Sequence, residues 1–156
     1  MTSILPYKYT SSPINEMIVA SECVTIGEYA FAYCSYLQIL QLPDSIKEFQ
    51  KSSFQNCSSL KYFNLPTSLE IIGEKAMSFC FSLELLCIPK QVKLIGDLAF
   101  EGCRNLTFVE FLSPSTEVGY NIFKDCVSLE CIYIPKGSKD HYSSLMPQTI
   151  NILYEQ

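Results

Sequence analysis

The chain has 156 residues and a mass of 17.7 kDa, which is the size of one domain or of one short array of repeats. Apolar residues make up 48% of the sequence and charged residues only 17%, so the composition predicts a folded chain and excludes intrinsic disorder. The formal net charge is -5, whereas a surface that binds phosphate groups carries clustered cations. Nucleic-acid binding is therefore not expected.

The distribution of apolar residues gives no sign of a membrane segment. No apolar run approaches the ~18 residues that a spanning helix needs. The first twenty residues contain Pro6, Lys8, Pro13, Asn15 and Glu16, where a signal peptide needs an unbroken apolar core. We therefore expect no membrane insertion and no classical export signal.

A repeat of 23 residues runs through most of the sequence. Each unit begins with a cysteine that is followed three residues later by a leucine. These pairs are Cys34 and Leu37, Cys57 and Leu60, Cys80 and Leu83, Cys103 and Leu106, and Cys126 and Leu129. Other columns keep the same spacing, so the unit reads C-x-x-L-x-x-L-x-L-P-x-x-[IVL]-x-x-I-G-x-x-A-F-x-x-C. A fixed period of this length indicates a solenoid.

Each part of the unit predicts a local structure. The L-x-x-L-x-L stretch alternates, so Leu40 and Leu42 point to one face of a short strand and Ile39 and Gln41 to the other. Proline then ends the strand, glycine provides a permissive backbone for a turn, and A-F-x-x-C fits a single helical or 3-10 turn. One unit cannot bury its own apolar residues, so we expect the units to stack as a parallel β-solenoid with the strand on the concave side.

The succession of L-P, I-G-x-x-A-F and C-x-x-L resembles leucine-rich repeats, and more narrowly their 23-residue BspA-like subclass, over about residues 14 to 154. The resemblance implies an α/β solenoid with a parallel concave β-sheet and short helical or 3-10 turns on the convex side. The whole chain, 1–156, is then one solenoid. It would contain a degenerate N-terminal coil (1–22), about five repeats (23–135) and a C-terminal cap (136–156).

Two details of the ends follow from this alignment. In the N-terminal coil, a constant 23-residue step places Lys8 at the phenylalanine position and Ser11 at the cysteine position. In the C-terminal cap, the resemblance implies a short helix from about Lys139 to Leu145 and a last strand from about Ile150 to Leu153. Terminal repeats are commonly atypical because one of their sides faces water.

The eight cysteines allow three interpretations. We favour a reduced structural column, in which the thiols of successive coils lie in line and behave as small hydrophobic groups. One or two disulfides, or a metal site, are the alternatives. A metal is the weakest of them, because there is no C-x-x-C pair and His141 is the single histidine. Cys87 and Cys131 stand at strand positions that face outward.

The sequence predicts neither an enzyme nor a cofactor. His141 falls in the capping segment, so a nucleophile would have to reach the end of the array to pair with it. No glycine-rich phosphate loop and no H-E-x-x-H string occurs in the sequence. We therefore assign no catalytic and no metal-binding residue.

The outward positions of the predicted strands are the candidate binding surface. Ile39, Tyr62, Leu85 and Phe108 follow one another at 23-residue steps and form an apolar stripe, with Glu110 and Tyr133 at its edge. A contiguous apolar patch indicates contact with a partner. The simpler alternative is that these residue types merely favour strands.

The leading hypothesis is a non-enzymatic module that binds a protein partner through the concave face, with self-association as a second use of the same surface. The resemblance to BspA-like proteins implies a surface antigen or adhesin. The alternative is an intracellular leucine-rich repeat scaffold or regulator, favoured by reduced cysteines and by the N-terminal sequence. The localisation stays open between the two.

Overall fold

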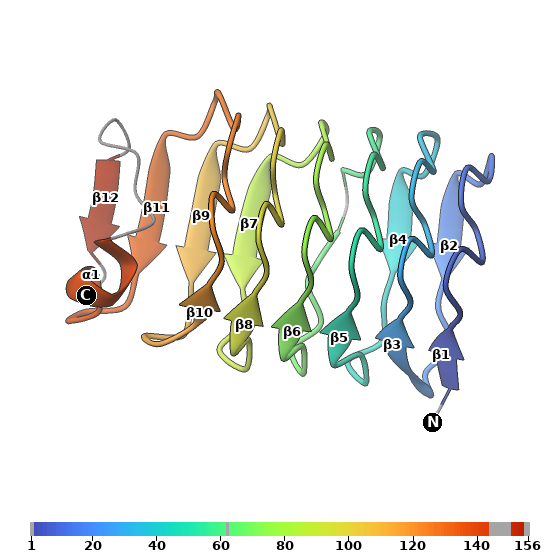
Figure 1. Ribbon diagram of the computed structural model, residues 1–156, viewed down its shortest axis with the longest axis horizontal. Coiled ribbons are helices and arrows are strands. Elements are labelled where there is room, and N and C mark those ends of the chain that lie inside the picture. Colours follow the sequence, from blue (N-terminus) through green and yellow to red (C-terminus); the bar gives the residue numbers. More distant parts are fainter. Residues whose placement is uncertain (1, 62, 144–150, 155–156) are drawn as a thin grey trace.

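A computed structural model of the chain describes residues 2–61, 63–143 and 151–154. The chain folds as a parallel β-solenoid, in which each coil pairs its strands with those of the neighbouring coils (Figure 1). Two rows of strands run along the solenoid, and turns form its remaining side. The predicted parallel stacking of the repeats is confirmed.

One row, here called the side sheet, is continuous over six coils in the order β1-β3-β5-β6-β8-β10 (Figure 1). Its strands are β1 (Thr2–Ile4), β3 (Cys23–Ile26), β5 (Glu48–Phe49), β6 (Ile71–Ile72), β8 (Leu94–Ile95) and β10 (Glu117–Val118). Most are only two residues long, so they show no alternation in the sequence, and the sequence analysis did not predict this sheet.

The other row, here called the front sheet, contains the L-x-x-L-x-L strands. Its members are β2 (Glu16–Ile18), β4 (Ile39–Gln41), β7 (Leu85–Ile88), β9 (Phe108–Phe111), β11 (Cys131–Ile134) and β12 (Asn151–Tyr154). The row is interrupted: β2 pairs only with β4, and β7, β9, β11 and β12 form a separate group. Residue 61 and residues 63–65, which lie between β4 and β7, form no strand (Figure 1).

The core consists of apolar columns that repeat from coil to coil. Leu40, Leu86 and Val109 point inward from the front sheet and are buried, as the alternation predicts. On the turn side the rings of Phe31 and Phe54 stack with their centroids 5.4 Å apart. Each coil thus buries its apolar residues against copies of the same positions in its neighbours.

The turn side contains hydrogen-bonded turns rather than helices in the part of the chain that the structure describes, so the expected helical or 3-10 pieces are not confirmed. Two columns of the turns have left-handed backbone, and non-glycine residues occupy almost all of these positions. The columns are Tyr29, Ser52, Lys75, Leu98 and Asn121, and Tyr33, Asn56, Phe79, Gly102 and Asp125.

The repeated glycine has a different role from the one expected. Gly96 does not have a positive φ, but a Cβ atom built on it would lie 2.5 Å from the backbone nitrogen of Glu74 in the preceding coil. The same crowding occurs at Gly27, Gly73 and Gly119. The prediction of a turn-permissive glycine was wrong, because the glycine allows a close approach of backbones. Gln50 stands in this column, and its side-chain oxygen accepts a hydrogen bond from the Glu28 N–H at 3.2 Å.

The N-terminal coil is one residue shorter than the others. Ile4 pairs with Ile26, a step of 22 residues, whereas Glu16 pairs with Ile39, a step of 23. Tyr9 therefore takes the phenylalanine position, and its ring stacks on Phe31 with centroids 5.1 Å apart. The assignments of Lys8 and Ser11 to the phenylalanine and cysteine positions were wrong, because they assumed a constant step.

The C-terminal end is covered by helix α1 (Lys139–Tyr142). Tyr142 is buried, and its hydroxyl donates a hydrogen bond to the Ser113 carbonyl at 2.6 Å. The same oxygen accepts one from the Thr116 N–H at 3.2 Å. His141 Nε2 lies 2.8 Å from the Thr116 carbonyl, so the histidine is part of the cap. The expected helix end at Leu145 and strand start at Ile150 lie outside the described residues.

Candidate functional site

The front sheet carries the described members of the predicted site on its outer face. Leu85 pairs with Phe108 in register, and Ile39 pairs with Glu16. Leu85 is 64% exposed, and Ile39 and Phe108 are half-buried. Tyr62, the remaining member of the predicted stripe, lies outside the described residues.

On the C-terminal part of this face, side chains of β7, β9 and β11 contact one another. The rings of Phe108 and Tyr133 are in contact, with centroids 5.0 Å apart. The Cys87 thiol donates to Glu110 Oε2 at 3.5 Å. The pKa of Cys87 is raised. The main cause is partial desolvation of the thiol, and the hydrogen bond to Glu110 and its negative charge add to it. The structure thus brings Leu85, Phe108, Glu110 and Tyr133 together on neighbouring strands, while Ile39 lies beyond the interruption.

Two open hollows flank the interruption of the front sheet. The hollow on the β4 side has a volume of about 570 Å³ and includes Ile39, Lys61 and Glu84 in its lining. The hollow on the β7 side has a volume of about 660 Å³. Phe63, Asn64 and Leu85 line both. The first hollow therefore lies between Ile39 and Leu85, two described members of the predicted stripe, and a hollow at this place was not predicted from the sequence.

The backbone explains this hollow. Among the described residues, no backbone hydrogen bond joins residues 63–65 to β4 or to β7. Asn64 stands where the other coils have Ile18, Gln41, Cys87, Glu110 and Tyr133. Asparagine is among the residues that strands disfavour, and this is the one sequence signal for the interruption.

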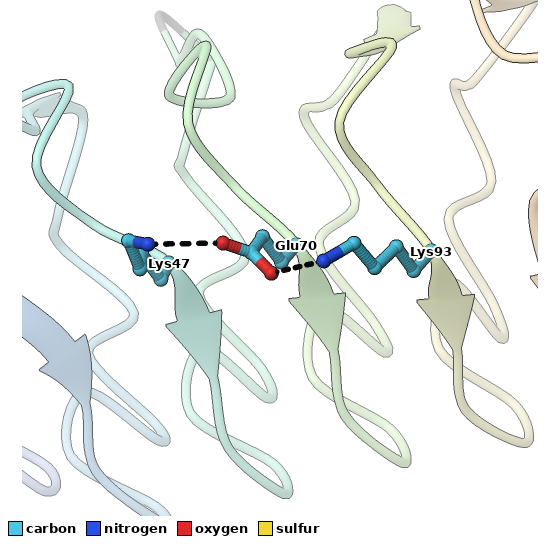
Figure 2. A network of polar contacts seen from close by, with 3 residues as sticks. All are labelled: Lys47, Glu70 and Lys93. Carbon is cyan, nitrogen blue, oxygen red and sulfur yellow. Dashed lines mark hydrogen bonds and ion pairs between the residues drawn. The ribbon is translucent and has the colours of Figure 1, made fainter.

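Charged residues at 23-residue spacing connect the coils outside this face. Glu70 forms ion pairs with Lys47 at 3.1 Å and with Lys93 at 2.6 Å, at the start of three successive strands of the side sheet (Figure 2). Glu70 accepts hydrogen bonds from Lys93 and Lys47. These hydrogen bonds, that of Lys93 first, and the positive charges of the two lysines lower the pKa of Glu70. Lys51 and Glu74 form a similar pair at 3.0 Å. These pairs join adjacent coils and so support their register.

The cysteine column has a hydrogen-bonding role besides its packing role. The Cys57 thiol donates to the Phe31 carbonyl at 3.1 Å, and the Cys80 thiol donates to the Phe54 carbonyl at 3.3 Å. Burial raises the pKa of Cys80 to about 12. All eight cysteines are free thiols. No cluster of three metal-ligating side chains occurs among the described residues.

In the described part of the chain, no helix has the length and apolar character needed to cross a membrane.

Comparison with known proteins agrees with this geometry. The family model for the BspA type leucine rich repeat region, in six copies, matches residues 2–130. No curated protein matches the chain.

Several solved structures have a similar fold. A leucine-rich repeat protein from Bacteroides ovatus is 22% identical with a TM-score of 0.77, over 97% of this chain and 45% of that protein. A leucine rich cell surface protein from Faecalibacterium prausnitzii is 24% identical with a TM-score of 0.72, over 85% of this chain and 35% of that one. The leucine rich repeat protein of T. pallidum is 25% identical with a TM-score of 0.70, over 98% and 78%. The chain thus spans less than half the length of the first two proteins.

Proposed function

The chain belongs to the BspA type leucine-rich repeat family, and we propose that it is a non-enzymatic module that binds a protein partner through the outer face of its front sheet. The proposed contact residues are Ile39, Tyr62, Leu85, Phe108, Glu110 and Tyr133. Repeat solenoids commonly use such an extended sheet face for binding.

One observation carries the proposal: an apolar side chain of the sheet is left in water beside an aromatic pair. Leu85 is 64% exposed on a strand whose neighbouring residues Leu86 and Ile88 are buried. It is in register with Phe108, whose ring packs on Tyr133. Aromatic residues near the centre of an apolar patch commonly dominate binding energy. We therefore expect Phe108 to be the main anchor and Leu85 to fill the space beside it.

Two cellular locations are candidates for this binding. Family membership supports a surface antigen or adhesin, and self-association is a further use of the same face. The alternative is an intracellular scaffold or regulator, which the expectation of a reduced cysteine column favours, because thiols outside cells are commonly paired in disulfides. A thiol count on protein recovered from its native source without reductant distinguishes the two, since eight free thiols indicate a reducing compartment.

Affinity capture with wild type and with the double variant Leu85→Ala, Phe108→Ala tests the binding face. The double variant should lose about 2–4 kcal/mol of affinity for captured partners, the range of interface hot spots. The double variant Lys47→Ala, Lys93→Ala on the side sheet is the control and should retain binding. A folded front-face variant that captures every wild-type partner would show that recognition uses another surface.

A further inference from the structure

The hollow of about 660 Å³ on the β7 side is lined mainly by apolar side chains. Phe63 and Leu65 contribute from the coil before β7, and Leu85 and Phe108 contribute from β7 and β9. The outward side chains of Leu85 and Phe108 place the hollow on the outer face of the front sheet. A mostly apolar concavity of this volume with a few polar groups is typical of a small-ligand site.

One residue of the lining departs from the repeat. Leu112 stands at the position that is proline in other coils, namely Pro43, Pro66, Pro89 and Pro135. Its side chain is 44% exposed and lines the hollow together with Pro89. Because this side chain is not part of the buried core, core packing does not account for it. The departure adds an exposed apolar group to the hollow.

The charges around the hollow have one sign. Lys90 is the only charged residue among the described residues that line it. Lys90 is exposed and forms no ion pair with any described residue. Two carboxylates lie near β7 but do not line the hollow: Glu84 pairs with Lys61 at 2.9 Å, and Glu110 accepts a hydrogen bond from Cys87. An anionic group in the hollow is therefore attracted to Lys90 and repelled from the other positions.

We propose that this hollow binds a medium-chain monocarboxylate, whose alkyl chain lies on Leu85, Phe108 and Leu112 and whose carboxylate pairs with Lys90. The ligand lies over outward side chains and leaves the backbones of the neighbouring coils in place. The exposed Gln91 amide, which also lines the hollow, is a second donor for the carboxylate. This inference goes beyond protein binding and does not rest on the proposed function, because it concerns a small ligand of the chain alone.

Isothermal titration calorimetry of the intact chain with sodium octanoate, below its micelle concentration, tests the site. Binding should be saturable. Across hexanoate, octanoate and decanoate the affinity should rise about twofold to threefold per methylene, which is less than the about fourfold of complete burial because the hollow is open to water. A lack of saturation, or an affinity that does not depend on chain length, would overturn the proposal.

The charge is tested with Lys90→Gln at low ionic strength. This variant should bind octanoate about threefold more weakly, the upper range for an exposed ion pair, and should bind uncharged 1-octanol like wild type. Lys136→Gln, an exposed lysine at the same repeat position, is the control and should have no effect. An equal effect of Lys90→Gln on octanoate and octanol would contradict the assigned ion pair.

The apolar part of the site is tested with two exposed leucines. Leu112→Ala should weaken octanoate and octanol alike by about threefold, because it removes apolar contact area from the ligand. Leu94→Ala is the matched control, since Leu94 is 41% exposed on the side sheet and does not line the hollow. Equal binding by the two variants would show that the alkyl chain does not lie on Leu112.

The position of the ligand is tested by thiol protection. Cys87 lines the hollow, whereas Cys126 lies on the turn side. Octanoate at ten times its dissociation constant should slow the alkylation of Cys87 about fivefold or more and leave the rate of Cys126 unchanged. An unchanged rate at Cys87 would place the ligand elsewhere and overturn the proposal. These tests need no protein partner, so their failure leaves the capture experiment unaffected.

Discussion

The side sheet and the front sheet are built from the same repeat, yet only the side sheet is continuous. In the side sheet six successive coils each contribute a strand, and the coils are joined by ion pairs such as those of Glu70 (Figure 2). In the front sheet, residues 63–65 form no strand and no backbone hydrogen bond to β4 or β7 within the described part of the chain. The shared period therefore determines that the coils stack. The residues of a single coil determine whether its front segment pairs with the strands on either side.

The largest effect that distinguishes the two sheets is expected for a matched pair of phenylalanines. Phe49 of the side sheet is fully buried and packs edge-on against Phe54, whereas Phe63 at the interruption is half-buried and lines both hollows. Phe49→Ala should cost about 3–5 kcal/mol in the free energy of unfolding, the usual range for a buried aromatic. Phe63→Ala should cost less, about 2 kcal/mol, because its half-buried ring contacts Phe54 and Phe49 but also borders the hollows. Urea unfolding of both variants provides the comparison, and equal losses would mean that Phe63 is packed as tightly as Phe49.

Two adjacent leucines of β7 test the assignment of the outer face. Leu86 is 3% exposed and Leu85 is 64% exposed. Leu86→Ala should cost about 2–5 kcal/mol, because it leaves a cavity in the core. Leu85→Ala should stay within about 0.5 kcal/mol of wild type. The reverse order in thermal unfolding would mean that the strand faces are exchanged.

Thiol reactivity compares the turn side with the front face. Cys87 is exposed and should be alkylated first under native conditions, although its pKa is raised. Cys126 should follow, because its hydrogen bond with Cys103 lowers its pKa while the side chain is half-buried. Cys80, with a pKa of about 12, should react only when the chain unfolds. Mass spectrometry of the labelled peptides gives the order, and unfolded protein, in which all eight cysteines should react, is the control.

The smallest effect is expected for the charge network of the side sheet. Because Lys93 and Lys47 lower the pKa of Glu70, its ion pairs stabilise the fold above the carboxyl's ordinary pKa, and this contribution is lost as the pH falls through the lowered value. Glu70→Gln should slightly lower the Tm at neutral pH and low salt, and the difference should vanish in acid and at high salt. Glu117→Gln, on the same sheet, is the control. A difference between wild type and Glu70→Gln that persists in acid would contradict an electrostatic origin.

Much of the fold could be predicted from the sequence because the same pattern of apolar residues, proline and glycine occurs in several coils. The inward position of Leu86 and the outward position of Leu85 followed from alternation alone. The shortened first coil did not, because a single missing residue has no second copy with which to compare it. The role of the repeated glycine was also missed, since its reason is a backbone in the neighbouring coil.

The candidate site was predicted only in part. Sequence spacing placed Leu85, Phe108, Glu110 and Tyr133 on one face, and the structure brings them together there. It did not predict the hollow that lies between Ile39 and Leu85. Asn64 was a weak signal, because strand preference depends on the neighbouring rungs as well as on the residue itself.

The repeat in the sequence is enough to predict a solenoid and the inward and outward faces of its strands, because columns of apolar residues at a constant period can be buried only by stacking. Which neighbouring coils form backbone hydrogen bonds in the front sheet is visible only in the folded chain. Backbone pairing requires two adjacent rungs to reach hydrogen-bonding distance together, and that condition depends on the packing beneath both. The hollows beside β4 and β7 are products of that packing.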